Sequence, residues 1–80
     1  KIKMDKKEIK EIIEKTLEGS SADVDGGEGK FSANIVFDGF NGLNTIKRHK
    51  MVYNCLDSFI KSGELHAISL KTFTHDENKS

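Results

Sequence analysis

The sequence has little of what disulfide-bonded, membrane-spanning or strongly charged proteins contain. Its single cysteine, Cys55, cannot form an internal disulfide, which suits a reducing compartment. The apolar runs are far shorter than the roughly 20 residues that span a bilayer, and no leader of basic and apolar residues opens the chain. With 13 basic and 13 acidic side chains, the formal net charge is zero, so no overall field favours nucleic acid or anionic lipid. We therefore expect a soluble protein that does not bind membranes.

The length of 80 residues is enough for one domain with a thin core, because a chain of this size buries only about 60% of its unfolded surface. We expect this domain to run from residue 5 to 77, with flexible ends at residues 1–4 and 78–80. The chain begins with lysine and not methionine. "KIK" is therefore either an addition ahead of a native Met4 or what remains after a presequence was removed.

Two segments have the spacing of amphipathic helices. In the first, Asp5 to Leu17, Asp5 and Glu8 resemble a capping box and Gly19 is a natural left-handed stop. The second runs from Asn44, a plausible N-cap, to a stop at Gly63, and is one long helix or two short ones. The apolar positions that we expect to face the core are Ile9, Ile12, Ile13, Thr16, Leu17, Ile46, Val52, Tyr53, Leu56, Phe59 and Ile60.

Three segments are predicted to be strands. "KFSANIVFDG", from Lys30, alternates apolar and polar residues, and "SADVD" before it is a weaker candidate. Between them "DGGEG" predicts a hairpin with a mobile, exposed loop. The third strand is the apolar run from Leu65 to Phe73, and "HDENKS" after it is a frayed end. Because a helical crossover implies parallel pairing, the prediction is an α/β (α+β) two-layer fold, α-β-β-α-(α)-β, with a mixed three-stranded sheet.

His66 stands at the start of the predicted third strand, on the same face as Ile68 and Leu70. One interpretation is a partly buried histidine whose ring nitrogens are satisfied by a backbone carbonyl or water. The other is a metal ligand at a strand end, with one nitrogen held by the protein and the other free to bind. The residues alone leave both interpretations open.

Other chemistry has weaker support in the sequence. Cys55 with His49, His66 and His75 lacks the paired short spacings of structural zinc sites. Cys55 flanks the apolar helix face, which favours a small buried side chain over a reactive thiol. No nucleophile stands with an obvious base. We therefore expect no enzymatic activity.

The run "IKRHK" places Lys47, Arg48, His49 and Lys50 on about one turn of helix. Such a patch could face solvent, an acidic protein partner or phosphates. "GFNG", residues 39–42, matches the G-x-x-G of phosphate-gripping KH loops weakly. The basic turn is therefore a candidate surface for binding a protein or, as an alternative, nucleic acid.

Three separated motifs, "FDGFNG", "RHKMVY" and "LHAISL", resemble the signatures of the BolA-like family over residues 8–77. The resemblance implies a class II KH-like fold. It also implies a non-enzymatic partner of monothiol glutaredoxins in iron–sulfur cluster trafficking.

In such proteins the histidine that matches His66 is a ligand of a bridging [2Fe-2S] cluster, and the glutaredoxin cysteine and glutathione supply thiolates. Relatives often place a second histidine or cysteine in the first hairpin. Lys30 stands there in this chain, and a protonated lysine has no lone pair to donate. His75 stands where relatives commonly have proline, and we expect it to be a solvated tail histidine.

The sequence therefore predicts a cluster-handling adaptor that is a monomer when alone and holds no cofactor by itself. His66 is the expected ligand and the basic helix is the expected docking surface. The alternative is a nucleic-acid-binding regulator that uses the KH-like fold and the same helix. We expect a cytoplasmic location, with the nucleus, or the mitochondrion after loss of a presequence, as alternatives.

Overall fold

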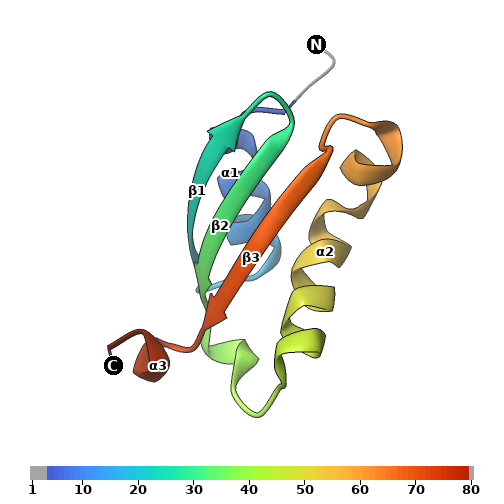
Figure 1. The fold of residues 1–80 in the computed structure, drawn as a ribbon. Coiled ribbons are helices and arrows are strands. Elements are labelled where there is room, and N and C mark those ends of the chain that lie inside the picture. Colours follow the sequence, from blue (N-terminus) through green and yellow to red (C-terminus); the bar gives the residue numbers. More distant parts are fainter. Residues whose placement is uncertain (1–3, 80) are drawn as a thin grey trace.

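The computed structural model describes residues 4–79 and contains one three-stranded sheet with helices on one side (Figure 1). The mixed α+β fold predicted from the sequence is confirmed, and the helical segment after the second strand is split into a short 3-10 helix and a long helix. The elements in chain order are α1 (Lys6–Thr16), β1 (Ser21–Gly27), β2 (Lys30–Val36), η1 (Asp38–Phe40), α2 (Thr45–Ser62), β3 (Ala67–Phe73) and α3 (His75–Lys79).

Helix α1 begins and ends as its local sequence predicts. The Asp5 side chain accepts the Glu8 N–H at 2.9 Å, and the Glu8 carboxylate accepts the Asp5 N–H at 3.2 Å, which completes the capping box. Gly19 follows the helix with φ +87°. Ile9 and Ile13 are buried, whereas Thr16, expected on the same face, is exposed.

Helix α2 is a single helix of 18 residues. The Asn44 side chain accepts the Lys47 N–H at 2.9 Å, and Gly63 ends the helix with φ +85°. Val52 and Leu56 are fully buried, but Ile46 is 67% exposed. The assignment of Ile46 to the core face is therefore wrong. Ile46 aligns with Tyr53 and Ile60 at seven-residue spacing, and this line, with Tyr53 and Ile60 each 37% exposed, lies at the border of the apolar face.

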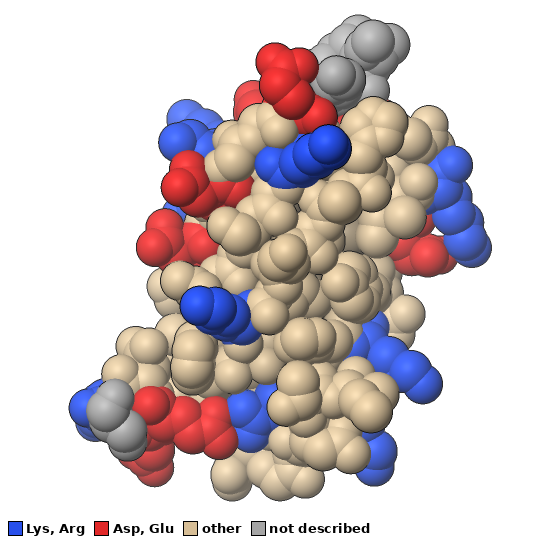
Figure 2. All heavy atoms as spheres, in the orientation of Figure 1, with Lys and Arg blue, Asp and Glu red and all other residues tan. Residues whose placement is uncertain are grey.

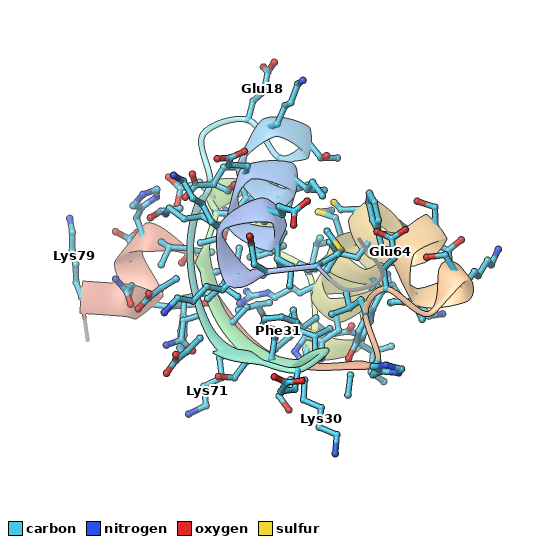
Figure 3. The ribbon with its side chains drawn as sticks, turned by 90° about the horizontal axis from the view of Figure 1, so that it is seen from above. Glu18, Lys30, Phe31, Glu64, Lys71 and Lys79 are labelled. Carbon is cyan, nitrogen blue, oxygen red and sulfur yellow. The ribbon has the colours of Figure 1, made fainter. Side chains whose placement is uncertain are left out.

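The strand order is β1-β2-β3, with β1 and β2 antiparallel and β2 and β3 parallel. Seen from above (Figure 3), α1 and α2 lie on the same side of the sheet, and Phe31 points toward them while Lys30 and Lys71 point away. The alternation in β2 therefore separates a core face from an open face. The buried core consists of Met4, Ile9, Ile13, Leu17, Ala22, Phe31, Ala33, Ile35, Phe40, Val52, Leu56, Leu65 and Ile68.

The first hairpin is tighter than predicted. Gly26 pairs with Phe31 and Gly27 with Lys30, so the ladder continues to the last residue before a two-residue turn. That turn is Glu28 and Gly29, with φ +55° and +78°. Positive φ at both positions is what a type I′ hairpin requires. The predicted loop over residues 25–29 is therefore wrong, because its first two glycines belong to β1.

The outer edge of β1 is bound by side chains of α1. The Ala22 N–H donates to the Glu14 carboxylate at 2.9 Å, and the Ala22 carbonyl accepts from the Lys10 ammonium at 2.7 Å. The Ala22 N–H, together with Lys10, lowers the pKa of Glu14. Glu14 and Lys10 also bind each other at 2.7 Å. These contacts attach α1 to an edge that would otherwise present free backbone groups.

The outer edge of β3 is bound by side chains of α2. The Tyr53 hydroxyl donates to the Ile68 carbonyl at 3.1 Å, and the Arg48 guanidinium lies 3.4 Å from the Thr72 carbonyl. Both carbonyls point away from β2. Tyr53 therefore has a polar function at this edge, which its place in the apolar periodicity does not indicate.

The ends of the described chain are more ordered than the sequence predicts. Met4 is buried and its N–H donates to the Glu64 carbonyl at 3.2 Å, so the expected flexible end at residue 4 is wrong. Asn78 and Lys79 belong to α3, which replaces the predicted frayed end. The rest of the predicted ends, residues 1–3 and 80, lies outside the described residues. Among residues 4–79, no helix is long and apolar enough to span a membrane.

Candidate functional site

His66 lies between a buried anchor and the start of β3. Leu65 before it is fully buried, and its N–H donates to the Phe59 carbonyl at 3.1 Å. β3 begins at Ala67, two residues later than predicted, and the His66 side chain is exposed. The interpretation as a partly buried strand histidine is therefore wrong. The imidazole stands at the surface, where another molecule can reach it.

The turn of the first hairpin holds the backbone of His66. The Gly29 carbonyl accepts the N–H groups of His66 and Ala67 at 2.8 and 3.0 Å. Gly29 itself is buried, and its Cα lies under the imidazole. A Cβ built there would overlap Cδ2 of His66 and lie 3.1 Å from its Cγ. In the sequence Gly29 is predicted only as a loop residue, and the parallel pairing of β2 with β3 is what brings it next to His66.

Lys30 is the other predicted site residue at this end of the sheet. It pairs with Ala67 in the β2–β3 ladder, which makes it a neighbour of His66 in space. Its exposed side chain points away from the helices (Figure 3). An ammonium carries positive charge but no lone pair while protonated. Lys30 can therefore attract an anionic group near His66 and cannot be a second ligand in that state.

His66 does not belong to a metal site that the described part of the chain completes by itself. Within residues 4–79, no three His, Cys, Asp or Glu side chains are grouped so that they could hold a metal ion. A neutral imidazole is a good ligand for iron, copper or zinc, but one ligand does not complete a coordination shell. An ion bound through His66 would take its remaining ligands from another molecule. The site therefore fits a shared ion or cluster better than a resident one.

Arg48, predicted as part of a docking surface, is instead a structural residue. Its guanidinium binds the Glu77 carboxylate through two contacts of 2.6 and 2.9 Å, and its Nε donates to the Leu43 carbonyl at 2.8 Å. It also lies 5.8 Å from the Phe40 ring centroid. Only 12% of the side chain is exposed. Arg48 is therefore removed from the predicted binding surface, because its donors already bind Glu77 of α3 and the Leu43 and Thr72 carbonyls.

The Arg48–Glu77 pair makes the attachment of α3 sensitive to acid. Arg48, and then the Thr74 N–H, lower the pKa of Glu77 to about 2. A lowered carboxyl pKa stabilises the folded state at pH values above the ordinary pKa of 4.5, and this contribution is lost as the pH falls toward 2. We expect the amide NMR signals of α3 to shift toward random-coil positions in that range. His75 also lowers the pKa of Asp38, so protonation of Asp38 at low pH weakens the attachment of α3 in the same way.

Glu77→Gln is the variant that isolates this contribution. At pH 7 it should already show the α3 signals that the unmodified protein shows near pH 2, while the sheet signals stay in place. Asp38→Asn is the matched control for the part that depends on His75. Identical titrations of the unmodified protein and Glu77→Gln would contradict the role of the pair.

The remaining basic residues of α2 are available at the surface. Lys47 and Lys50 are exposed, and His49 is half-buried, as its position three residues before Val52 predicts. Figure 2 shows the open face of the sheet as mostly uncharged, with acidic atoms along the β1 side and basic atoms along the α2 side. No continuous basic surface crosses the face drawn there. On the face drawn in Figure 2, Lys and Arg atoms are therefore separated by uncharged and acidic atoms.

Cys55 does not contribute to the His66 site. It is half-buried, and its thiol lies 3.3 Å from the Met51 carbonyl. Burial raises the pKa of the Cys55 thiol. A protonated, partly buried thiol is a poor nucleophile. This agrees with the sequence-based prediction of a mainly structural side chain.

His75 lies at the opposite end of β3 from His66. Seven strand residues separate them, which is about 23 Å at 3.3 Å per residue. The two histidines therefore cannot share one ion. His75 is exposed but not a free tail residue, since its Nδ1 lies 3.0 Å from the Asp38 carboxylate. A hollow of about 300 Å³ at this end is lined by Asp38, Asn41, Thr74 and Asp76.

Comparison with known proteins gives the family. The model of the BolA-like protein family matches residues 4–77. A bolA protein homologue from Coxiella burnetii has 36% identity and a TM-score of 0.88, with 96% of this chain and 99% of that chain covered. The BolA domain of SufE1 from Arabidopsis thaliana has 35% identity and a TM-score of 0.79, with 89% and 92% covered.

A curated relative agrees with these structures. The acid stress protein IbaG of Escherichia coli strain K12 is 28% identical over 92% of this chain and 88% of its own length. The family model spans every element from α1 to β3 and includes both Gly29 and His66. The chain therefore belongs to the BolA-like family.

Proposed function

We propose that this protein is a non-enzymatic adaptor in iron–sulfur cluster trafficking. In this role it forms a complex with a monothiol glutaredoxin, either without metal or bridged by a [2Fe-2S] cluster. The observation that carries the proposal is the exposed imidazole of His66, held by the first hairpin of a BolA-like chain. The cluster is cargo shared between two proteins, and this chain supplies one of its ligands.

The chemistry of the site supports this division of ligands. His66 provides one neutral nitrogen, and the glutaredoxin cysteine and glutathione provide the thiolates. An imidazole in place of a thiolate raises the reduction potential of a [2Fe-2S] cluster. Lys30, which pairs with Ala67 next to His66, adds a positive charge at this end of the sheet, where the thiolates and sulfides would be bound. We propose the cytoplasm as the location of this reaction.

The direct test is to mix the protein with a glutathione-loaded monothiol glutaredoxin that carries its cluster. The expected result is a new visible absorption and circular dichroism spectrum with one copy of each protein in the complex. If the spectrum remains that of the glutaredoxin homodimer and no complex elutes in gel filtration, the proposal is wrong.

Lys47 and Lys50 are predicted to speed the encounter with an acidic partner surface. Replacing both by alanine should lower the association rate with glutaredoxin about tenfold at low ionic strength, because exposed charges steer the encounter more than they hold the complex. Stopped-flow or biolayer interferometry would measure this rate. Lys71→Ala, an exposed lysine on the open sheet face, is the matched control. Equal rates for all three proteins would remove the α2 lysines from the interface.

The nucleic-acid alternative gives a different salt dependence. Binding to duplex DNA should weaken with a log–log slope of roughly −0.9 for each phosphate contacted. Without Arg48, the basic turn offers only Lys47 and Lys50 as exposed cations. This is a small surface for phosphate contacts, and the neutral net charge adds no attraction. Glutaredoxin binding is therefore the function that we favour.

A further inference from the structure

We infer that Gly29 is a positioning residue for His66, and that its missing side chain sets the direction in which the imidazole faces a partner's ion or cluster. The inference rests on the proposed function and extends it to a residue that donates no ligand. Two features of Gly29, its carbonyl and its bare Cα, act on His66 separately.

The carbonyl fixes the backbone. It accepts two consecutive N–H groups, from His66 and Ala67, and so ties the start of β3 to the hairpin turn. Any amino acid at position 29 would keep this carbonyl. The backbone attachment alone therefore does not require glycine.

The Cα fixes the side chain. The imidazole lies so close to Gly29 that an added Cβ would overlap Cδ2, lie 3.1 Å from Cγ and lie 3.4 Å from Nε2. Because Cδ2 is the nearest ring atom, the edge that carries Nδ1 and Cε1 is the one farther from the turn. A methyl group at position 29 would push the ring off this surface and change the direction of both nitrogens.

The left-handed backbone at position 29 is a separate reason for glycine, and a control can isolate it. Gly29 has φ +78°, and Gly19 has φ +87° with nothing within 4 Å of an added Cβ. Substitution at Gly19 therefore adds backbone strain without a clash, whereas substitution at Gly29 adds both. Asparagine tolerates this backbone region better than other non-glycine residues. Gly29→Asn and Gly19→Asn are thus a matched pair, and Gly29→Ala tests whether the asparagine amide itself matters.

The first measurement uses the isolated protein. In the unmodified chain we expect a nuclear Overhauser effect between the Gly29 Hα protons and Hδ2 of His66. In Gly29→Asn and Gly29→Ala the Hδ2 and imidazole ¹⁵N signals should move, with the far-ultraviolet circular dichroism unchanged. In Gly19→Asn the imidazole signals should stay in place. If the unmodified protein lacks the Overhauser contact, the inference is wrong whatever the variants do.

The second measurement uses the complex with cluster-loaded glutaredoxin. Misdirected ligands typically weaken metal binding about ten- to a hundredfold, so the Gly29 variants should lose the cluster faster by a factor in that range. Gly19→Asn should lose it at the unmodified rate. If the imidazole signals move but the cluster lifetime does not, Gly29 does not position a ligand. If the unmodified protein binds no cluster at all, the proposed function fails, whereas the first measurement still tests the contact itself.

Discussion

Replacing His66 with alanine is expected to abolish the spectrum of the cluster-bridged complex with glutaredoxin and to leave the domain folded. The side chain is exposed and follows a buried anchor, Leu65, which remains in place. Exposed substitutions of this kind usually change the free energy of unfolding by less than about 0.5 kcal/mol. The thermal unfolding midpoint should therefore stay unchanged, whereas the visible spectrum of the cluster-bridged complex should be lost. Both can be measured on the same sample.

His75→Ala is the matched control for this experiment. It removes an imidazole of similar exposure from the far end of β3, where no ion shared with His66 can lie. Its spectrum should equal that of the unmodified complex. The glutaredoxin homodimer, which needs no histidine from this chain, should keep its own spectrum in all samples. A heterocomplex cluster that survives His66→Ala would disprove the ligand role.

Replacing Phe40 with alanine should cause the largest loss of stability in this chain. Phe40 is fully buried, packs edge-on against Phe37 at 5.2 Å between ring centroids, and carries the Arg48 guanidinium over its face. Removal of a buried phenylalanine typically costs about 3–5 kcal/mol. Domains of this kind have only about 5–15 kcal/mol in total. Urea unfolding should show a lower midpoint with little change in slope.

Ile46→Ala is the control for the Phe40 experiment. The helical spacing of α2 suggests a core position for Ile46, but its side chain is 67% exposed. Its replacement should change the free energy of unfolding by no more than about 0.5 kcal/mol. A loss below about 1.5 kcal/mol for Phe40→Ala, or a larger loss for Ile46→Ala, would show that the core is not centred where the structure places it.

The helix caps and Ile46 show why part of the fold can be predicted from the sequence and part cannot. Asp5, Glu8, Asn44 and Gly63 act within one turn of helix, so their capping functions follow from neighbours in the sequence. The direction in which a helix faces the sheet depends on residues far away in the chain. Ile46 aligns with Tyr53 and Ile60 at seven-residue spacing, and all three are exposed, whereas Val52 and Leu56 reach the core.

The candidate site, like the fold, can be predicted from the sequence only in part. His66 can be singled out from the sequence because a histidine at the mouth of an apolar strand is unusual there. The roles of Arg48 and Gly29 depend on contacts across 29 and 37 positions of the chain, with Glu77 and His66. Neither charge spacing nor a glycine-rich turn contains that information. In the sequence, Arg48 therefore resembles its exposed neighbours Lys47 and Lys50, although its contacts are different.

The helix side chains bound along the two sheet edges have a consequence for self-association. A bare edge strand can pair with the same strand of another molecule and so start aggregation. Here the Ala22 N–H and carbonyl on β1 are already bound to α1, and the Ile68 and Thr72 carbonyls on β3 are bound to α2. Another copy would have to displace Glu14, Lys10, Tyr53 or Arg48 before it could add a strand. The bound groups of Ala22, Ile68 and Thr72 therefore hinder the addition of a further strand at either edge of the sheet.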